Sequence, residues 1–288
     1  MVMWMKRFFS EERLILFGLT LVLFFQSPSS FGAAKKGVKV SSEFNYNKVR
    51  PMPVSCIGPE DAEHFMVYLH GADLGHIGPY ERENRVALEE IANTLKIRIA
   101  VPRATSLCSG TVIGEVCWWV FDHPELVERT MTQVLDARES CFPRSQPFGI
   151  LGFSNGGYLL NHWFVKNQCS ISSGKDRKLP SWMIAFSAIG IGGQPLEEEQ
   201  HFDGSHCPAL QYVIGDRDLN NFDRTFYHHL QMRGARLLPV DMFKGKHELE
   251  PKALYHALEK IFHNKTHLND DHRGDATRSL HGINESHK

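Results

Sequence analysis

Short apolar runs alternate along the chain with longer segments in which apolar residues recur every three or four positions. The runs have the length of strands, at 64–69, 97–101, 148–153, 181–186, 209–214 and 237–243. The periodic segments predict amphipathic helices at 82–96, 126–138, 156–166, 221–233 and 251–262. Strands that are apolar on both faces and alternate with helices indicate an α/β fold, with a mostly parallel sheet covered by helices on both sides.

Residues 1–34 differ from the rest of the chain and have the layout of a secretory signal peptide. Basic residues such as Arg7 and Arg13 precede an apolar run at 14–25, and small residues follow it up to Ala34. The run falls short of the roughly 20 residues that cross a bilayer as a helix, and an uncleaved membrane anchor is the alternative. We expect export to the medium or the periplasm, and no stable membrane insertion after cleavage.

The remaining chain divides into two parts by composition. Residues 35–262 contain all the predicted strands and helices, and a polar lead-in at 38–59 predicts one or two early antiparallel strands. With no linker between two cores, 35–262 is expected to be a single domain. Residues 263–288 are rich in histidine and poor in apolar side chains, which predicts a disordered tail, and the histidine spacing matches no defined metal site.

Composition excludes two classes of protein. The 32 Lys and Arg against 33 Asp and Glu give a net charge of −1, whereas a dedicated nucleic-acid binder carries a basic excess. An aromatic content of 11% is too high for a disordered chain. These totals predict a globular protein that acts on small or uncharged partners, and they leave the oligomeric state open.

Six cysteines follow the signal segment, and an even set in an exported protein predicts disulfides. They are Cys56, Cys108, Cys117, Cys141, Cys169 and Cys207. Cys108 and Cys117 lie close together in a predicted loop and are candidates to staple it. The pairing of the other four stays open, and none has the surroundings of a nucleophile.

The strongest chemical signal is the segment GFSNG at 152–156, between a predicted strand and a predicted helix. This is the G-x-S-x-G pattern of a nucleophile elbow in the structural context that gives it meaning. A serine at so sharp a turn takes strained backbone angles, and the flanking glycines avoid collision with neighbouring backbone. We therefore predict that Ser154 presents an exposed hydroxyl at the carboxyl edge of the sheet.

A serine nucleophile needs a base and an acid that orients the base. The segment GDRD at 215–218 follows a later strand, and either Asp218 or Asp216 can supply the acid, with Asp218 preferred for its reach over the sheet edge. His247 follows the last strand and precedes the last helix, where it can take the serine proton. The order Ser, Asp, His at successive strand ends makes this combination more specific than any member alone.

Two backbone N–H groups are candidates for an oxyanion hole. Asn155 directly follows the nucleophile, and the segment LHGA at 69–72 ends the first predicted strand of the regular region, with Ala72 the preferred second donor. Such donors stabilise the negative charge that develops on the substrate oxygen in the transition state.

With these segments the chain resembles the α/β-hydrolase superfamily from about Phe65 to Phe262. The resemblance rests on LHGA, GFSNG, GDRD and the GKH segment at 245–247. Export and the pair Trp118–Trp119 after Cys117 make it similar to secreted esterases of the polyhydroxybutyrate-depolymerase and feruloyl-esterase type, although no polymer-binding module is present in the sequence. The resemblance implies ester hydrolysis through an acyl-serine intermediate, with neither metal nor organic cofactor.

The substrate is expected to be a small-molecule or polymeric ester at an open site. Residues 188–207, between two predicted strands, are too few for a separate lid domain. His70, Trp118 and Trp119 are candidates to line the substrate pocket, and the two tryptophans can equally pack over the sheet edge. The alternatives are a serine peptidase on the same fold and a hydrolase-fold binding protein without catalysis.

Overall fold

The computed structural model describes residues 53–74, 77–108, 115–118, 126–166, 179–190, 207–218 and 223–263. All of them belong to one compact unit of the chain, Tyr46–Lys288. The predicted signal segment 1–34 lies outside the described residues, as does the polar tail after His263.

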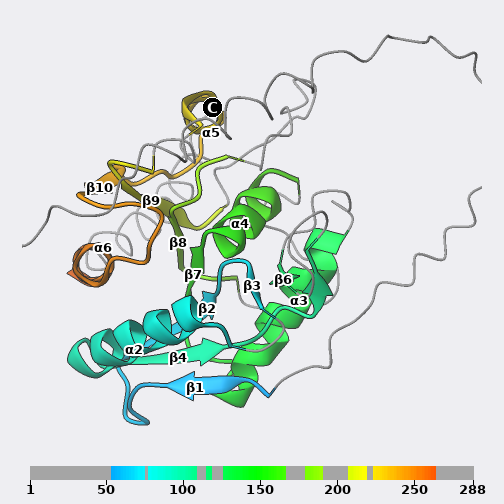
Figure 1. Cartoon of the computed structure of the whole chain (residues 1–288), viewed down its shortest axis with the longest axis vertical. Helices are drawn as coiled ribbons and strands as arrows, with labels where there is room; N and C mark the ends of the chain where they lie inside the picture. Colours follow the sequence, from blue (N-terminus) through cyan, green and yellow to red (C-terminus); the bar gives the residue numbers. More distant parts are fainter. Residues whose placement is uncertain are drawn as a thin grey trace, which may run out of the picture. The chain divides into compact units, whose positions relative to one another are not determined.

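The centre of the domain is a seven-stranded sheet in the order β1-β4-β2-β7-β8-β9-β10 (Figure 1). Its strands are β1 (Ser55–Ile57), β2 (His64–Leu69), β4 (Ile97–Val101), β7 (Gly149–Phe153), β8 (Trp182–Phe186), β9 (Ala209–Gly215) and β10 (Asp241–Phe243). Only the edge strand β1 is antiparallel to its neighbour, and the other pairs are parallel. The mostly parallel α/β sheet expected from the apolar runs is confirmed.

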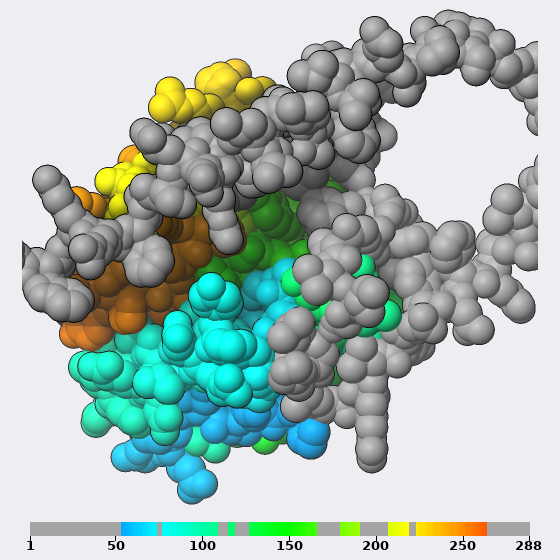
Figure 2. Space-filling model, viewed as in Figure 1, coloured from blue at the N-terminus to red at the C-terminus, as the bar shows by residue number. Residues whose placement is uncertain are grey.

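Helices cover both faces of this sheet. They are α2 (Pro79–Thr94), α3 (Leu126–Ala137), α4 (Asn155–Lys166), α5 (Arg224–Met232) and α6 (Pro251–His263), with a short 3-10 turn η2 (Arg138–Ser140) after α3. The buried side chains of α3, α4 and α5 form one core cluster, and those of α2 and α6 form a second. Figure 2 shows the cyan surface of α2 adjoining the orange surface of α6.

Strand β2 divides its side chains between the two cores, as its period of two residues requires. Val67 and Leu69 pack into the cluster with α3 and α4. Met66 and Tyr68 pack into the cluster with α2 and α6. All four are fully buried, which explains why a strand covered on both faces appears in the sequence as a continuous apolar run.

A second, three-stranded sheet was not predicted. It consists of β3 (Asp73–Leu74), β5 (Ser106–Leu107) and β6 (Glu115–Cys117), in the antiparallel order β3-β6-β5. The sequence indicated only a long loop here, because two- and three-residue strands are too short to show alternation. The predicted pair Cys108–Cys117 forms a disulfide at the end of this small sheet.

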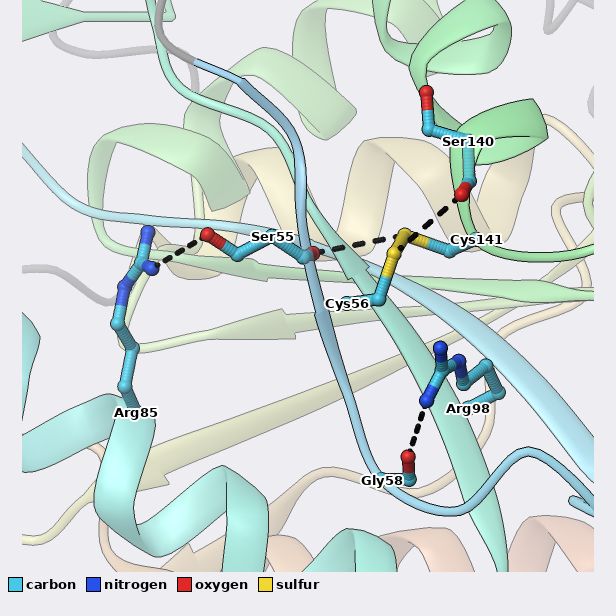
Figure 3. Close-up of a disulfide and its surroundings, with 7 residues drawn as sticks. All are labelled: Ser55, Cys56, Gly58, Arg85, Arg98, Ser140 and Cys141. Atoms are coloured by element: carbon cyan, nitrogen blue, oxygen red, sulfur yellow. Dashed lines mark hydrogen bonds between the residues drawn. A yellow bond between two sulfur atoms is a disulfide. The ribbon is translucent and has the colours of Figure 1, made fainter.

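A disulfide also joins Cys56 in β1 to Cys141 just after η2, over a sequence separation of 85 residues (Figure 3). It fastens the antiparallel edge strand to the turn that follows α3. Beside it, Arg85 of α2 donates a hydrogen bond to the hydroxyl of Ser55, at 3.2 Å (Figure 3). Cys207 is disulfide-bonded as well.

Two predicted elements are shorter in the structure. The strand expected at 237–243 pairs continuously only over Asp241–Phe243, with Leu237 forming an isolated bridge to Leu210. Pro239 lies between them and has no N–H for the ladder. Helix α5 begins at Arg224, where the Asp223 carboxylate accepts a hydrogen bond from the N–H of Phe226, at 3.0 Å.

None of the helices in the described part of the chain is both long and apolar enough to cross a membrane.

Candidate active site

Ser154 occupies the turn between β7 and α4 with a φ of 51°, in the left-handed region that side chains seldom adopt. Its N–H donates to the carbonyl of Phe186 at the end of the neighbouring strand β8, at 2.9 Å. A Cβ on Gly152 would lie 2.5 Å from the carbonyl oxygen of Gly156, so the strand and helix approach too closely for a side chain there. This strained geometry matches the predicted elbow.

Three side chains predicted to act together form a continuous chain of hydrogen bonds. His247 Nε2 lies 2.8 Å from Ser154 Oγ, and His247 Nδ1 lies 2.8 Å from Asp218 Oδ2. With its proton on Nδ1, the imidazole donates to the carboxylate and accepts from the serine hydroxyl. Asp218 is 5% exposed, whereas the His247 side chain is 40% exposed, so the carboxylate is shielded while the imidazole faces solvent.

The sequence left the acid open between Asp218 and Asp216, and the geometry distinguishes them. Of the two aspartates, Asp218 is the one with a carboxylate oxygen within hydrogen-bonding distance of His247. The Asp216 carboxylate instead accepts a hydrogen bond from the N–H of Gly245, at 3.0 Å. Asp218 therefore contacts the side chain of His247, whereas Asp216 contacts the backbone of the same loop at Gly245.

The two segments expected to form an oxyanion hole lie beside the serine. A Cβ on Gly71 would stand 3.2 Å from Ser154 Cβ, so the turn that carries Ala72 packs directly against the nucleophile. Asn155 begins α4, and helix N-termini favour negative charge. The Asn155 side chain accepts a hydrogen bond from the N–H of Trp118, at 2.7 Å.

His70 is fully buried, and backbone groups engage both of its ring nitrogens. Its Nδ1 contacts the carbonyl oxygen of Gly71, at 2.5 Å, and its Nε2 accepts from the N–H of Ala104, at 3.1 Å. Burial, with the nearby Arg103 guanidinium as a second cause, lowers the pKa of His70 to about 3. His70 was expected to line the substrate pocket. In the structure it is instead a buried, neutral imidazole that connects the turn at 70–72 to the backbone at Ala104.

Because the pKa of His70 is lower in the folded protein than in the unfolded chain, the free energy of unfolding depends on pH. Between pH 6.5 and about 3 the unfolded chain binds a proton on this residue that the folded protein does not. We expect the free energy of unfolding to fall as the pH falls through this window, by up to about 4–5 kcal/mol. Urea titrations from pH 7 to pH 3.5 measure this slope.

The variant His70→Asn is expected to show a shallower slope over the same range. His256→Asn, which removes an exposed imidazole from α6, controls for the loss of one histidine. Equal slopes for wild type and His70→Asn would contradict the role assigned to burial.

An ion pair that was not expected from the sequence lies directly after the same turn. Arg103 contacts Asp73 at 2.6 Å, and both side chains are almost fully buried. Asp73 also accepts a hydrogen bond from the N–H of Gly78, just before α2. No motif signals this pair, because its members lie 30 residues apart in segments without recognisable periodicity.

Trp118 is 6% exposed and belongs to the core cluster with α3 and α4. Its ring lies 5.0 Å from that of His70. This burial agrees with packing, one of the two interpretations open from the sequence, and a role of Trp118 in lining the substrate pocket stays a prediction. Trp119 lies outside the described residues.

Phe153, the residue that directly precedes the nucleophile, was also not singled out from the sequence. Its ring lies 5.5 Å from the imidazole of His247 and 6.3 Å from the ring of Phe186. A Cβ on Gly71 would lie 3.2 Å from the same ring. Phe153 thus fills the space between the base and the turn at 70–72, and its place inside the GFSNG pattern was the signal available for it.

Comparison with known proteins identifies the fold. No family model and no curated protein matches this chain. The structure is similar to that of esterase PE8, with a TM-score of 0.50 and 16% identity over 73% of this chain and 98% of that one. Acyl-protein thioesterase 2 from Zea mays is similar at a TM-score of 0.51 and 16% identity, over the same shares of the two chains. With its mostly parallel seven-stranded sheet, this chain has the α/β-hydrolase fold of such esterases.

Proposed function

We propose that this protein is an exported serine hydrolase that cleaves carboxylic esters. The single observation that carries the proposal is the hydrogen-bonded chain from Ser154 through His247 to Asp218, with both contacts at 2.8 Å. The strained turn under Ser154 and an esterase-like fold support it. Neither a metal nor an organic cofactor enters the proposed reaction.

The reaction begins when Ser154 Oγ attacks the carbonyl carbon of the ester and its proton passes to His247 Nε2. Asp218 holds the imidazole in the tautomer that can accept this proton and stabilises the imidazolium that forms. The oxygen of the tetrahedral intermediate carries the negative charge, and the N–H groups of Ala72 and Asn155 are the proposed donors to it.

Collapse of the intermediate expels the alcohol, which takes the proton from His247, and leaves an acyl group on Ser154. A water molecule then gives its proton to His247 and attacks the acyl carbon. The second tetrahedral intermediate releases the carboxylic acid and returns the proton to Ser154 Oγ. Each proton that leaves an oxygen thus returns to an oxygen by way of one imidazole.

The proposed substrates are the esters handled by secreted polyhydroxybutyrate-depolymerase and feruloyl-esterase types, to which the sequence motifs are similar. Export is proposed from the signal-like layout of residues 1–34. The disulfides at Cys56–Cys141 and Cys108–Cys117 are consistent with it.

The test uses the purified wild-type protein with its disulfides intact. We expect turnover of short-chain p-nitrophenyl esters, and reaction with a fluorophosphonate probe that leaves a phosphonyl group on the tryptic peptide containing Ser154. A panel of acetyl, butyryl, feruloyl and hydroxybutyrate esters then ranks the acyl groups. A folded protein that neither hydrolyses an ester nor reacts with the probe contradicts the proposal, and preference for amide substrates would make it a peptidase.

A further inference from the structure

The proposed acid and base stand on two loops that follow adjacent parallel strands. Residues 216–218 follow β9, and residues 244–250 connect β10 to α6. Because both strands end at the carboxyl edge of the sheet, the loops emerge side by side. The distance between the Asp218 carboxylate and the His247 imidazole therefore depends on how these two loops are fastened to each other.

Among the described residues, three hydrogen bonds join the first loop to the end of β10 and to the second loop. The N–H of Asp216 donates to the carbonyl of Phe243 at 2.8 Å, and the N–H of Arg217 donates to the carbonyl of Gly245 at 3.0 Å. The third comes from a side chain: Asp216 Oδ1 accepts the N–H of Gly245 at 3.0 Å. Gly245 is thus held through both its N–H and its carbonyl, two residues before His247.

The backbones of the two loops are in direct contact at this point. A Cβ on Gly215 would lie 2.6 Å from the carbonyl oxygen of Lys246 and 2.7 Å from that of Gly245. The His247 side chain is 40% exposed, so the surrounding core does not enclose the imidazole. Its position depends on its hydrogen bonds, the neighbouring ring of Phe153 and the loop that carries it.

We infer that Asp216 is a positioning residue, whose carboxylate clamps the loop at Gly245 and so sets the imidazole of His247 between Ser154 and Asp218. The inference rests on the proposed function. It concerns the residue of the GDRD segment that does not itself touch His247.

This positioning role requires an acceptor oxygen on the side chain of residue 216 and does not require its negative charge. The Gly245 N–H needs an acceptor at this geometry, and an amide oxygen supplies one as well as a carboxylate. In the part of the chain that the structure describes, the nearest cationic group is Arg217, whose Nε lies 3.8 Å from Asp216 Oδ1, and both side chains are about half exposed. An ion pair exposed to this extent contributes little to the free energy that holds the two loops together.

The experiment compares D216A, which removes the acceptor, with D216N, which keeps it, and uses R217A as the matched control. For D216A we expect kcat on a p-nitrophenyl ester to fall about tenfold with KM within about twofold, because the aligned imidazole is less populated. The rate of fluorophosphonate labelling should fall by the same factor. D216N should stay within about threefold of wild type, and R217A within about twofold.

A readout independent of turnover is the NMR signal of the His247 Nδ1 proton, which is shifted downfield while it is hydrogen-bonded to Asp218. We expect it in wild type and D216N, and we expect it to be broadened or lost in D216A. If D216A does not fold, D216S replaces it, because its shorter side chain does not reach Gly245.

The outcomes separate the two proposals. Equal damage in D216N and D216A would show that the charge matters and would overturn the clamp, as would a D216A variant with unchanged kcat and an unchanged Nδ1 proton signal. If wild type hydrolyses nothing, the proposed function fails, and the Nδ1 signal still decides whether Asp216 positions His247.

Discussion

Replacement of Ser154 by alanine is expected to lower kcat on a p-nitrophenyl ester by about 10⁴- to 10⁶-fold and to abolish labelling by a fluorophosphonate probe. The hydroxyl is the only group at the elbow that the proposed mechanism uses as nucleophile, and it lies 2.8 Å from His247 Nε2. Steady-state kinetics, together with gel fluorescence of the labelled protein, measures both effects.

The matched control for this experiment is Ser187→Ala. Ser187 follows β8, next to the elbow, and has a φ of 54°, close to that of Ser154. Its hydroxyl is buried and, in the described part of the chain, has no hydrogen-bond partner. Activity of Ser187→Ala should stay within about threefold of wild type. Probe labelling that persists in Ser154→Ala would place the nucleophile elsewhere.

The second large effect is expected for Asp218→Asn, with a loss of about 10³- to 10⁴-fold in kcat. An asparagine in this position can turn its NH₂ group toward His247 Nδ1, where it favours the tautomer with the proton on Nε2. That tautomer cannot accept the serine proton. The size of the effect depends on the 2.8 Å contact between the two side chains.

Stopped assays at high enzyme concentration quantify the residual rate, and D216N from the same turn is the control for losing one negative charge. If Asp218→Asn retains a tenth or more of the wild-type kcat, Asp218 is not the orienting acid. Equal losses in D216N and Asp218→Asn would mean that the two aspartates share the task.

The sheet could be predicted because its strands are buried on both faces. In β2, β7, β8 and β9 almost every residue is apolar, so the strands appear as continuous runs. The positions of Ser154, Asp218 and His247 followed from these runs, since residues just after parallel strands meet at one edge. Their contact is part of the structure, and their catalytic roles remain a prediction.

The sequence favoured Asp218 over Asp216 only for its reach over the sheet edge, and it left both residues open as the acid. The two residues share one turn, and the path of that turn decides which carboxylate faces His247. The path depends on hydrogen bonds to residues of a different loop, such as the one from Arg217 N–H to the Gly245 carbonyl. A pattern within 215–218 contains no information about that partner.

The surroundings of the turn at 70–72 were also beyond sequence reasoning. The buried pair of Arg103 and Asp73 joins two segments that were expected to be loops. The role of His70 was missed because the N–H of Ala104, which its Nε2 accepts, lies 34 residues away and belongs to no motif. Such contacts are specific to the tertiary structure, whereas hydrophobic periodicity reports only on local burial.

The link between Cys56 and Cys141 also limits the conformational freedom of the denatured chain. Closing a loop over a separation of 85 residues removes chain entropy worth about 4–5 kcal/mol in the loop-closure description. That amount is similar to the whole stability of many domains. Protein prepared in a reducing bacterial cytosol would therefore lack a large part of its resistance to denaturation, and inactivity of such material would say nothing about the chemistry of Ser154.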